Sequence, residues 1–429
     1  MKILAKAILW IEPLLLAVMV AAFWFSDPSR VNFLLLLIPP ALARLILYRR
    51  LWLYNPLNVL LYVFIAFCVL NTFLALAEPT APYSWGWYMI GRPLMGVALV
   101  LYLISRVNER GSIDDLVLML VLLAILVGVL GLSSAQFTSK SNQLQFFVQL
   151  VPQLWGFPGA ERGFNVNEIG GAMAFFAPLA AGIAIHDWRY PKMRFRRAAA
   201  TLAFVLLSFA LFLGQSRLAI FGVVAALGAL AFLLIPAGRW RYGALTALVI
   251  FCALEGMIIG GVFAPQTAAA SDARDEASNS VRLEIWGAGL AIVRDYPLTG
   301  VGLNKFRSRE VRDRYPVPDF GSPIVPHTHN EILQVGTDLG IPGMVLFIAW
   351  NATVAVMIWK TWRKGTPFIK AVAVSAGAGL LAHTIFGLAD AITLFDRFIF
   401  AYWLLVALAG GAYVLANRLP AAESKLGEG

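Results

Sequence analysis

Apolar runs long enough to cross a membrane recur along almost the whole chain, and this repetition limits the possible folds more than any other feature. A spanning helix needs about 20 mostly apolar residues, because lipid offers no hydrogen-bond partner to an exposed backbone group. Strands of a membrane barrel would instead form alternating segments of about 10 residues. The sequence therefore predicts an all-α polytopic membrane protein with about 12 transmembrane helices, at residues 4–25, 31–48, 56–77, 90–105, 114–133, 169–186, 199–214, 218–236, 243–264, 339–359, 367–388 and 398–417.

Composition agrees with this fold class. The chain of 429 residues is 60% hydrophobic and 14% charged, whereas soluble domains are typically about 45–50% apolar and about 25% charged. The first run lacks a convincing cleavage site, so we expect it to stay as a helix rather than to be removed as a signal peptide. We expect transmembrane helices 1–9 within residues 1–264, a large and partly helical loop at 265–338, helices 10–12 within 339–417 and a tail at 418–429.

Lysine and arginine are distributed unequally between the two sides that this topology defines. An even number of helices places both termini on one side, and the short segments of that side carry about three times as many Lys and Arg as those opposite. Cytoplasmic loops show such an excess. The sequence therefore predicts cytoplasmic termini and, in a bacterium, a periplasmic loop at 265–338. The net charge of +10 then indicates topology rather than a nucleic-acid partner.

The loop 265–338 is the one long polar segment, and part of it has the pattern of a helix. Apolar residues recur at helical spacing between residues 281 and 294, with Ser280 as the expected N-cap and Pro297 as the end. This pattern predicts an amphipathic helix that packs on the membrane helices or lies at the interface, with Arg282 on its first turn. Its expected apolar face consists of Leu283, Trp286, Leu290 and Val293.

Two of the four histidines, His327 and His329, lie near the end of this loop. A His-x-His pair can bind a metal ion, but the sequence offers no further His or Cys nearby, since His186 and His383 lie near span ends and both cysteines lie inside apolar runs. The pair could also be structural or solvated. We favour a catalytic base, because imidazole exchanges a proton near neutral pH.

Between the two rings, His329 is the preferred base. Asn330 and Gln334 follow it at the start of an expected helix, where their amides can hold an imidazole or a sugar hydroxyl. We accordingly expect His327, Asn330 and Gln334 to contact substrate.

Three arginines are candidates for holding an anion. Arg217 lies at the outward turn between the seventh and eighth predicted spans, Arg282 in the loop helix, and Arg162 before the sixth span. Each could equally be a snorkelling arginine that contacts lipid headgroups. The loop 265–338 holds eight Lys and Arg against ten Asp and Glu, so it does not attract anions as a whole. A phosphate held there would need individual guanidinium groups, which bind it with two parallel hydrogen bonds.

Signatures of several other functions are missing from the sequence. It contains no Walker lysine motif, no Gly-x-Ser-x-Gly elbow and no His-Glu-x-x-His. No Asp-x-Asp stands at an outward span end as a ligand pair for Mg²⁺. A lipid or solute transporter stays an alternative, for which only Glu255, in the ninth span, is a clear ionisable residue near the middle of a span.

The ordered motifs of the chain resemble those of the bacterial O-antigen ligase family. They are Arg162-Gly-Phe-Asn-Val-Asn167, Gln215-Ser216-Arg217, Arg282 followed by Asp295-Tyr-Pro-Leu-Thr-Gly-Val-Gly302, and His327-Thr-His329-Asn330-Glu-Ile-Leu-Gln334 followed by Leu339-Gly-Ile-Pro-Gly343. The superfamily also contains O-antigen and exopolysaccharide polymerases and protein O-oligosaccharyltransferases. The resemblance extends over about residues 155–350.

The resemblance implies a membrane glycosyltransferase of the GT-C type in the bacterial inner membrane, with a periplasmic active site and neither metal nor cofactor. It implies transfer of a glycan from undecaprenyl diphosphate to a sugar hydroxyl of lipid A–core, with inversion at the anomeric carbon. Polymerisation of O-antigen or exopolysaccharide is the alternative within the superfamily. Carried over to this sequence, the resemblance makes His329 the base, Arg217 and Arg282 the residues that hold the diphosphate, and Arg162 and Asn167 further substrate-binding residues.

Overall fold

The computed structural model describes residues 1–23, 28–75, 84–137, 144–157, 160–259, 281–317 and 325–426. These residues form helices, turns and two isolated bridges, and no strand occurs among them, which confirms the predicted all-α class. The α-helices are α1 (Lys2–Ala22), α2 (Ile38–Tyr48), α3 (Asn58–Ala75), α4 (Ser84–Arg110), α5 (Asp114–Ser134), α6 (Gln145–Leu150), α7 (Val166–Asp187), α8 (Arg194–Gly214), α9 (Arg217–Leu234), α10 (Arg239–Ile259), a helix at 281–295, α12 (Arg309–Arg314), α13 (Glu331–Lys364), α14 (Pro367–Phe386) and α15 (Phe400–Leu426).

Nine helices in the described part of the chain are long and apolar enough to cross a membrane. Shorter apolar helices lie at Asn32–Tyr48 and Asn58–Leu74. Helix α10 coincides with the start of the predicted span 243–264, whose last residues are outside the described ranges. The count of 12 spans therefore stays a prediction. The nine are Lys2–Ala22, Met89–Arg110, Asp114–Ser134, Val166–Asp187, Arg194–Gly214, Arg217–Leu234, Glu331–Lys364, Pro367–Phe386 and Arg397–Arg418.

Helices α7, α14 and α15 form the centre of the bundle, with α8 and α9 against one side and α4 against the other. Glycines allow the close approach of α14 to its neighbours. A Cβ at Gly379 would lie 2.3 Å from the backbone oxygen of Phe175 in α7, and one at Gly222 in α9 would lie 2.3 Å from that of Ala382. Small residues at such crossings are typical of helices that pack in membranes. These contacts fix the height and rotation of α14 relative to α7 and α9.

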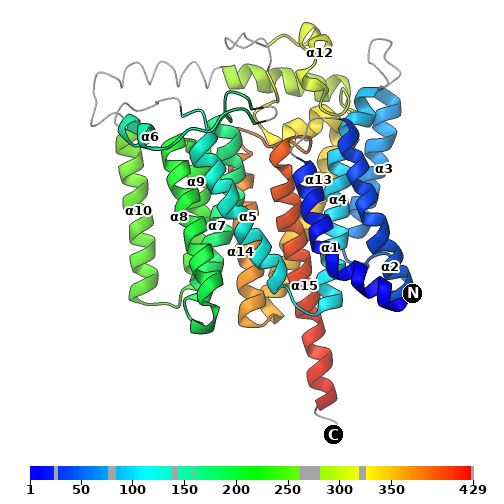
Figure 1. Ribbon diagram of the computed structural model, residues 1–429. Coiled ribbons are helices and arrows are strands. Elements are labelled where there is room, and N and C mark those ends of the chain that lie inside the picture. Colours follow the sequence, from blue (N-terminus) through cyan, green and yellow to red (C-terminus); the bar gives the residue numbers. More distant parts are fainter. Residues whose placement is uncertain are drawn as a thin grey trace.

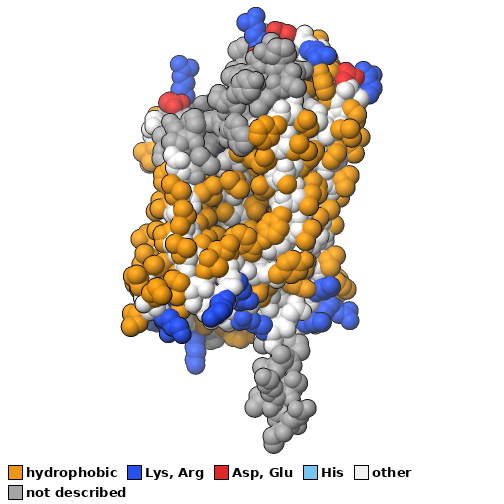
Figure 2. Space-filling model, turned by 90° about the vertical axis from the view of Figure 1, so that its right-hand side faces the viewer, with side chains coloured by type: hydrophobic (Ala, Val, Ile, Leu, Met, Phe, Trp, Pro, Cys, Tyr) orange, Lys and Arg blue, Asp and Glu red, His pale blue; other side chains and the backbone are white. Residues whose placement is uncertain are grey.

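The two ends of the bundle differ. Both termini lie at one end, whereas helix 281–295 and α12 cross the other end (Figure 1). One face of the molecule shows a wide band of hydrophobic side chains between the two ends (Figure 2). On that face Lys and Arg gather below the band, and charges of both signs are visible above it. A charge-free apolar band between two charged rims is the surface that a bilayer requires.

The end that carries the termini contains a buried group of charged side chains. Glu12 of α1 binds Arg44 of α2 and lies 3.2 Å from Arg106 of α4. Arg44 also binds Glu109 at 2.9 Å. The sequence pointed to Glu255 as the clear ionisable residue within a span, and this was incomplete, because Glu12 is buried within α1. Its arginine partners explain how α1 accommodates a carboxylate.

Helix 281–295 exists where the pattern predicted it, and two residues of its predicted apolar face, Trp286 and Val293, are partly buried. The fully buried face was not predicted. Ile285 and Ile292 are buried and pack with Phe306 and Val325. Leu283 and Leu290 are 64% and 61% exposed. The periodicity predicted the position of the helix, but it did not indicate that Ile285 and Ile292 face the neighbouring segments. The expected N-cap, Ser280, is outside the described ranges.

Candidate active site

Helix 281–295 lies along the loop and first turns that begin α13, and the two segments run in the same direction. Trp286 donates from its indole nitrogen to the backbone oxygen of His329 at 3.4 Å. A Cβ on Gly289 would lie 3.0 Å from Leu333 and 3.3 Å from Thr328. Helix 281–295 therefore presses directly on the backbone that carries His329.

A second set of contacts fixes the same segment against the end of α14. The amide of Asn330 donates to the backbone oxygen of Leu388 at 3.0 Å, and the backbone N–H of Glu331 donates to the oxygen of Gly387 at 2.8 Å. The carboxylate of Glu331 also lies 2.9 Å from Nε2 of His383. These contacts fix the position of the segment that precedes α13 relative to the segment that follows α14.

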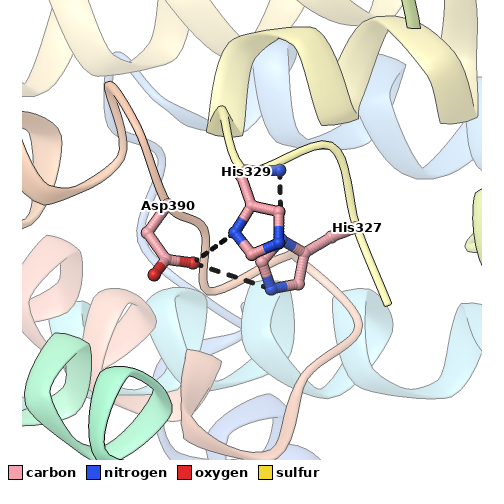
Figure 3. A group of neighbouring side chains, drawn as sticks. All are labelled: His327, His329 and Asp390. Carbon is pink, nitrogen blue, oxygen red and sulfur yellow. Dashed lines mark hydrogen bonds and ion pairs between the residues drawn. The ribbon is translucent and has the colours of Figure 1, made fainter. Parts of the chain in front are cut away.

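This arrangement of the two segments brings the two histidines next to a carboxylate from a distant part of the sequence. Nδ1 of His329 lies 3.2 Å from Oδ1 of Asp390, and Nε2 of His327 lies 3.7 Å from the same oxygen (Figure 3). The two imidazole rings have centroids 4.4 Å apart. Sequence analysis predicted the histidine pair but missed Asp390. The available signal was a carboxylate just beyond the outward end of the predicted span 367–388.

His327 is held in its neutral form. Its Nδ1 accepts the backbone N–H of His329 at 3.2 Å. Burial and the neighbouring ring of His329 lower the pKa of His327 to about 4. His327 is therefore a poor base at neutral pH. This agrees with the choice of His329 as the base, and it gives His327 the role of an acceptor that orients the backbone.

Asp390 is an ionised carboxylate. Burial would raise its pKa, but the hydrogen bond from His329, the neighbouring imidazole rings and the backbone N–H of Ala391 outweigh this effect, so the pKa lies below its usual range. Its Oδ1 also accepts the backbone N–H of Ala391 at 2.9 Å. A carboxylate at Nδ1 of an imidazole keeps the proton on that nitrogen, which makes Nε2 the basic position of the ring.

The backbone of His329 adopts an unusual conformation. Its φ is +51°, in the left-handed region that residues with a side chain rarely occupy. Such a conformation costs about 1–3 kcal/mol and persists only where the surroundings impose it. Here the backbone N–H of Thr328 donates to the side chain of Gln334 at 2.8 Å, and its hydroxyl donates to the backbone oxygen of Asn330 at 2.9 Å.

Asn330 and Gln334 were predicted to contact substrate, and the structure engages both amides within the protein. Asn330 caps α13 by accepting the N–H of Leu333 at 2.9 Å. Gln334 is buried, and it donates to Asp338 at 3.0 Å while it accepts from Thr328. Both residues thus shape the loop that presents His329, and their contact with substrate stays a prediction.

The two arginines assigned to the diphosphate lie at the same end of the bundle as His329. Arg282 is half-buried one helical turn before Trp286, which is about 6 Å along the helix axis. Arg217 is exposed at the first position of α9. Gly222 of α9 lies against Ala382 of α14. Arg217 lies five residues before Gly222, and Gly387 lies five residues after Ala382. Arg217 is therefore level with the segment that follows α14 and carries Asp390.

Arg162 and Asn167 lie in the segment that leads into α7. Arg162 is exposed, and its backbone oxygen accepts from the side chain of Gln136 at 2.9 Å. Asn167 lies in the first turn of α7, where its backbone N–H donates to the capping side chain of Asn165 at 2.8 Å. Their part in substrate binding stays a prediction.

The histidine and aspartate cluster could also hold a metal ion. One ligand atom from each of His327, His329 and Asp390 lies within 4.8 Å of the others. Sequence analysis considered only His and Cys near the pair, so it found no third ligand. The expectation that the reaction needs no metal stays a prediction.

Known proteins match the middle of the chain. Residues 202–348 match the family described as O-antigen ligase. A protein of Rickettsia bellii (strain RML369-C), named "Putative polysaccharide ligase", is 26% identical over 184 residues. That match covers 41% of this chain and 42% of the relative, so the chain spans less than half of the relative's length. The family match includes Arg217, Arg282 and His329. This match confirms the resemblance for residues 202–348, which are similar to the O-antigen ligase family.

Proposed function

We propose that this protein is an O-antigen ligase that transfers a glycan from a polyprenyl diphosphate carrier to a sugar hydroxyl, with His329 as the general base. The observation that carries the proposal is the contact of 3.2 Å between His329 and Asp390. Helix 281–295, whose Trp286 contacts the backbone of His329, crosses the end of the bundle opposite the termini. A base at this position suits an acceptor presented outside the membrane.

The reaction can be written with the residues of this chain. Nε2 of His329 takes the proton of the acceptor hydroxyl while the hydroxyl oxygen forms a bond to the anomeric carbon of the donor glycan. The bond between that carbon and the diphosphate oxygen breaks on the opposite face, and its electron pair leaves with the diphosphate, which gives inversion. Asp390 stabilises the imidazolium that forms. A diphosphate is a good leaving group, so fixed positive charge and a base can suffice without a metal.

Arg282 and Arg217 supply the positive charge in this scheme. Arg282 begins the helix whose Trp286 contacts the backbone of His329. Arg217 begins α9, which packs on α14 below the segment of Asp390. Guanidinium groups bind phosphate oxygens with two parallel hydrogen bonds, so they can hold the diphosphate while negative charge grows on it.

The finer assignments follow from the resemblance and the topology. The carrier is undecaprenyl diphosphate, the acceptor is a sugar of lipid A–core, and the protein lies in a bacterial inner membrane with cytoplasmic termini and a periplasmic site. Support comes from the helices able to span a membrane, from the termini lying at the end opposite His329, and from the family match.

The test is transfer by the purified full-length protein in detergent, with lipid-linked glycan as donor and defined core sugars as acceptors. We expect glycan on the acceptor, no transfer by His329→Ala, and normal transfer by the matched control His186→Ala at the other end of the bundle. Wild-type activity in His329→Ala would remove the assignment of the base. In a deletion strain, a ligase defect leaves uncapped lipid A–core, whereas single attached repeat units would identify a polymerase instead.

A further inference from the structure

The cluster of His327, His329 and Asp390 has the donor set of a transition-metal site. Two imidazole nitrogens and one carboxylate oxygen are ligands that zinc accepts, whereas Mg²⁺ and Ca²⁺ prefer sites made of oxygen alone. One ligand atom of each residue lies within 4.8 Å of the others. The side chains converge from two segments on a single region (Figure 3).

We propose that this cluster binds zinc or a similar divalent transition-metal ion, and that the bound ion inhibits the protein. The inhibition rests on the proposed function, because an imidazole that coordinates a metal through Nδ1 no longer has Asp390 as its hydrogen-bond partner. The binding itself does not depend on that function.

The distances are close to those of a tetrahedral site. With bonds of about 2.0–2.1 Å, ligand atoms around zinc are about 3.4 Å apart. Oδ1 of Asp390 already lies 3.2 Å from Nδ1 of His329 and 3.7 Å from Nε2 of His327. The ligand atoms of the two histidines, at most 4.8 Å apart, need to approach by at most about 1.4 Å. Small rotations of two side chains that are 13% and 20% exposed can supply this movement.

The local charge also favours a cation. Among the described residues, the ion-pair partners of Asp390 are the two histidines, with no Lys or Arg. The other His–Asp neighbours in the chain differ in this respect. His186 lies 2.9 Å from Asp187, but Arg196 lies 2.7 Å from the same carboxylate and occupies the place of a cation. This second pair is therefore a matched control.

Binding has a cost that limits its strength. Coordination through Nε2 of His327 moves the proton of the ring to Nδ1. Protonated Nδ1 can no longer accept the hydrogen bond from the backbone N–H of His329. The hydrogen bond between His329 and Asp390 is also exchanged for metal bonds. With three protein ligands and an open fourth position, we expect micromolar rather than nanomolar affinity.

The first experiment measures binding of ZnCl₂ by isothermal titration calorimetry to full-length protein in detergent, after treatment with EDTA and its removal. We expect one zinc ion per chain. Asp390→Asn and His327→Ala should each weaken binding at least ten-fold, whereas His186→Ala should bind as wild type does. Melting curves of each variant establish that it is folded. No binding by wild type, or equal binding by folded Asp390→Asn and wild type, would overturn the site.

The second experiment measures transfer with EDTA and with increasing ZnCl₂. We expect full transfer in EDTA, loss of transfer at the zinc concentration that saturates the site, and recovery when EDTA is added back. Zinc binding without any transfer activity would leave the metal site standing and reject the proposed function. Transfer that zinc does not affect at a saturating concentration would reject the inhibition and leave the proposed function standing. Transfer that EDTA abolishes and zinc restores would show that the ion is required, which contradicts inhibition.

Discussion

Oε2 of Glu331 lies 2.9 Å from Nε2 of His383, which joins the first residue of α13 to the last turn of α14. Both side chains are buried, and the imidazole of His383 stacks on the ring of Phe175 in α7 with centroids 3.9 Å apart. His329 precedes α13 and Asp390 follows α14. The buried pair therefore fixes the distance between two groups that it does not touch.

Glu331→Ala should lower both stability and transfer. It leaves the buried imidazole nitrogen of His383 without its partner, and an unsatisfied buried polar group costs about 1–3 kcal/mol. Glu331→Gln keeps an acceptor for the N–H of His383 and should lose less. Thermal melting in detergent and transfer rates measure the two effects.

A double-mutant cycle tests whether Glu331 acts through the His329–Asp390 contact. If it does, Glu331→Gln should slow transfer much less in an Asp390→Asn background than in wild type. Equal slowing in both backgrounds would show that Glu331 has only a general structural role.

Asp390→Asn should slow transfer by about 10²–10⁴-fold with little loss of stability, because an amide no longer keeps the proton of His329 on Nδ1. The rate with saturating lipid-linked donor is the measurement. Asp295→Asn is the control, since Asp295 lies at the same end of the bundle and is paired with Arg294 at 3.1 Å. A rate for Asp390→Asn close to that of the control would contradict the proposed role of Asp390.

Stability should fall as the pH is lowered from about 6.5 to 4. The pKa of His327 is lowered to about 4 in the folded protein, against about 6.5 when unfolded. Between these two pH values His327 is protonated in the unfolded chain but not in the folded protein. Protonation therefore lowers the free energy of unfolding by up to about 3 kcal/mol. His327→Asn should flatten the dependence of the melting temperature on pH in this window. An identical slope in wild type and His327→Asn would refute this origin.

Gly289→Val should displace helix 281–295 from the backbone at His329. Even its first added carbon would lie 3.0 Å from Leu333, and overpacking of this kind costs about 1–3 kcal/mol. Gly287→Val is the matched control on the same helix, because a Cβ at Gly287 meets no atom within 4 Å. Transfer rates should separate the two variants by at least ten-fold, and similar rates would show that the contact of this helix is not needed for activity.

Arg282→Ala should reduce transfer by about 10²–10³-fold, as expected for loss of one group that stabilises charge in the transition state. Arg282→Lys should recover only part of the rate, because an ammonium cannot bind phosphate with two parallel hydrogen bonds. Arg294→Ala, on the same helix and 79% exposed, should transfer normally. If Arg282→Lys equals wild type, a simple positive charge is sufficient at this position.

Part of the candidate site could be predicted from local sequence. The spacing of His327 and His329, the helix at 281–295 and the start of α13 after Asn330 are all visible within short segments. Asp390 and the Glu331–His383 pair could not be found in this way, since they join residues 61 and 52 positions apart. The fully buried residues of helix 281–295, Ile285 and Ile292, were missed for the same reason, because the period of a helix does not reveal where its neighbours lie.

The sequence by itself determined the membrane-spanning architecture, because the need for about 20 apolar residues is a property of each segment alone. Its motifs also determined the family of the central region. Only the tertiary structure decided which polar side chains meet at the end of the bundle. Those meetings depend on the height and rotation of α13 and α14, which are set by close contacts such as Gly379 against Phe175. No local pattern encodes such contacts, since each requires two distant surfaces to fit.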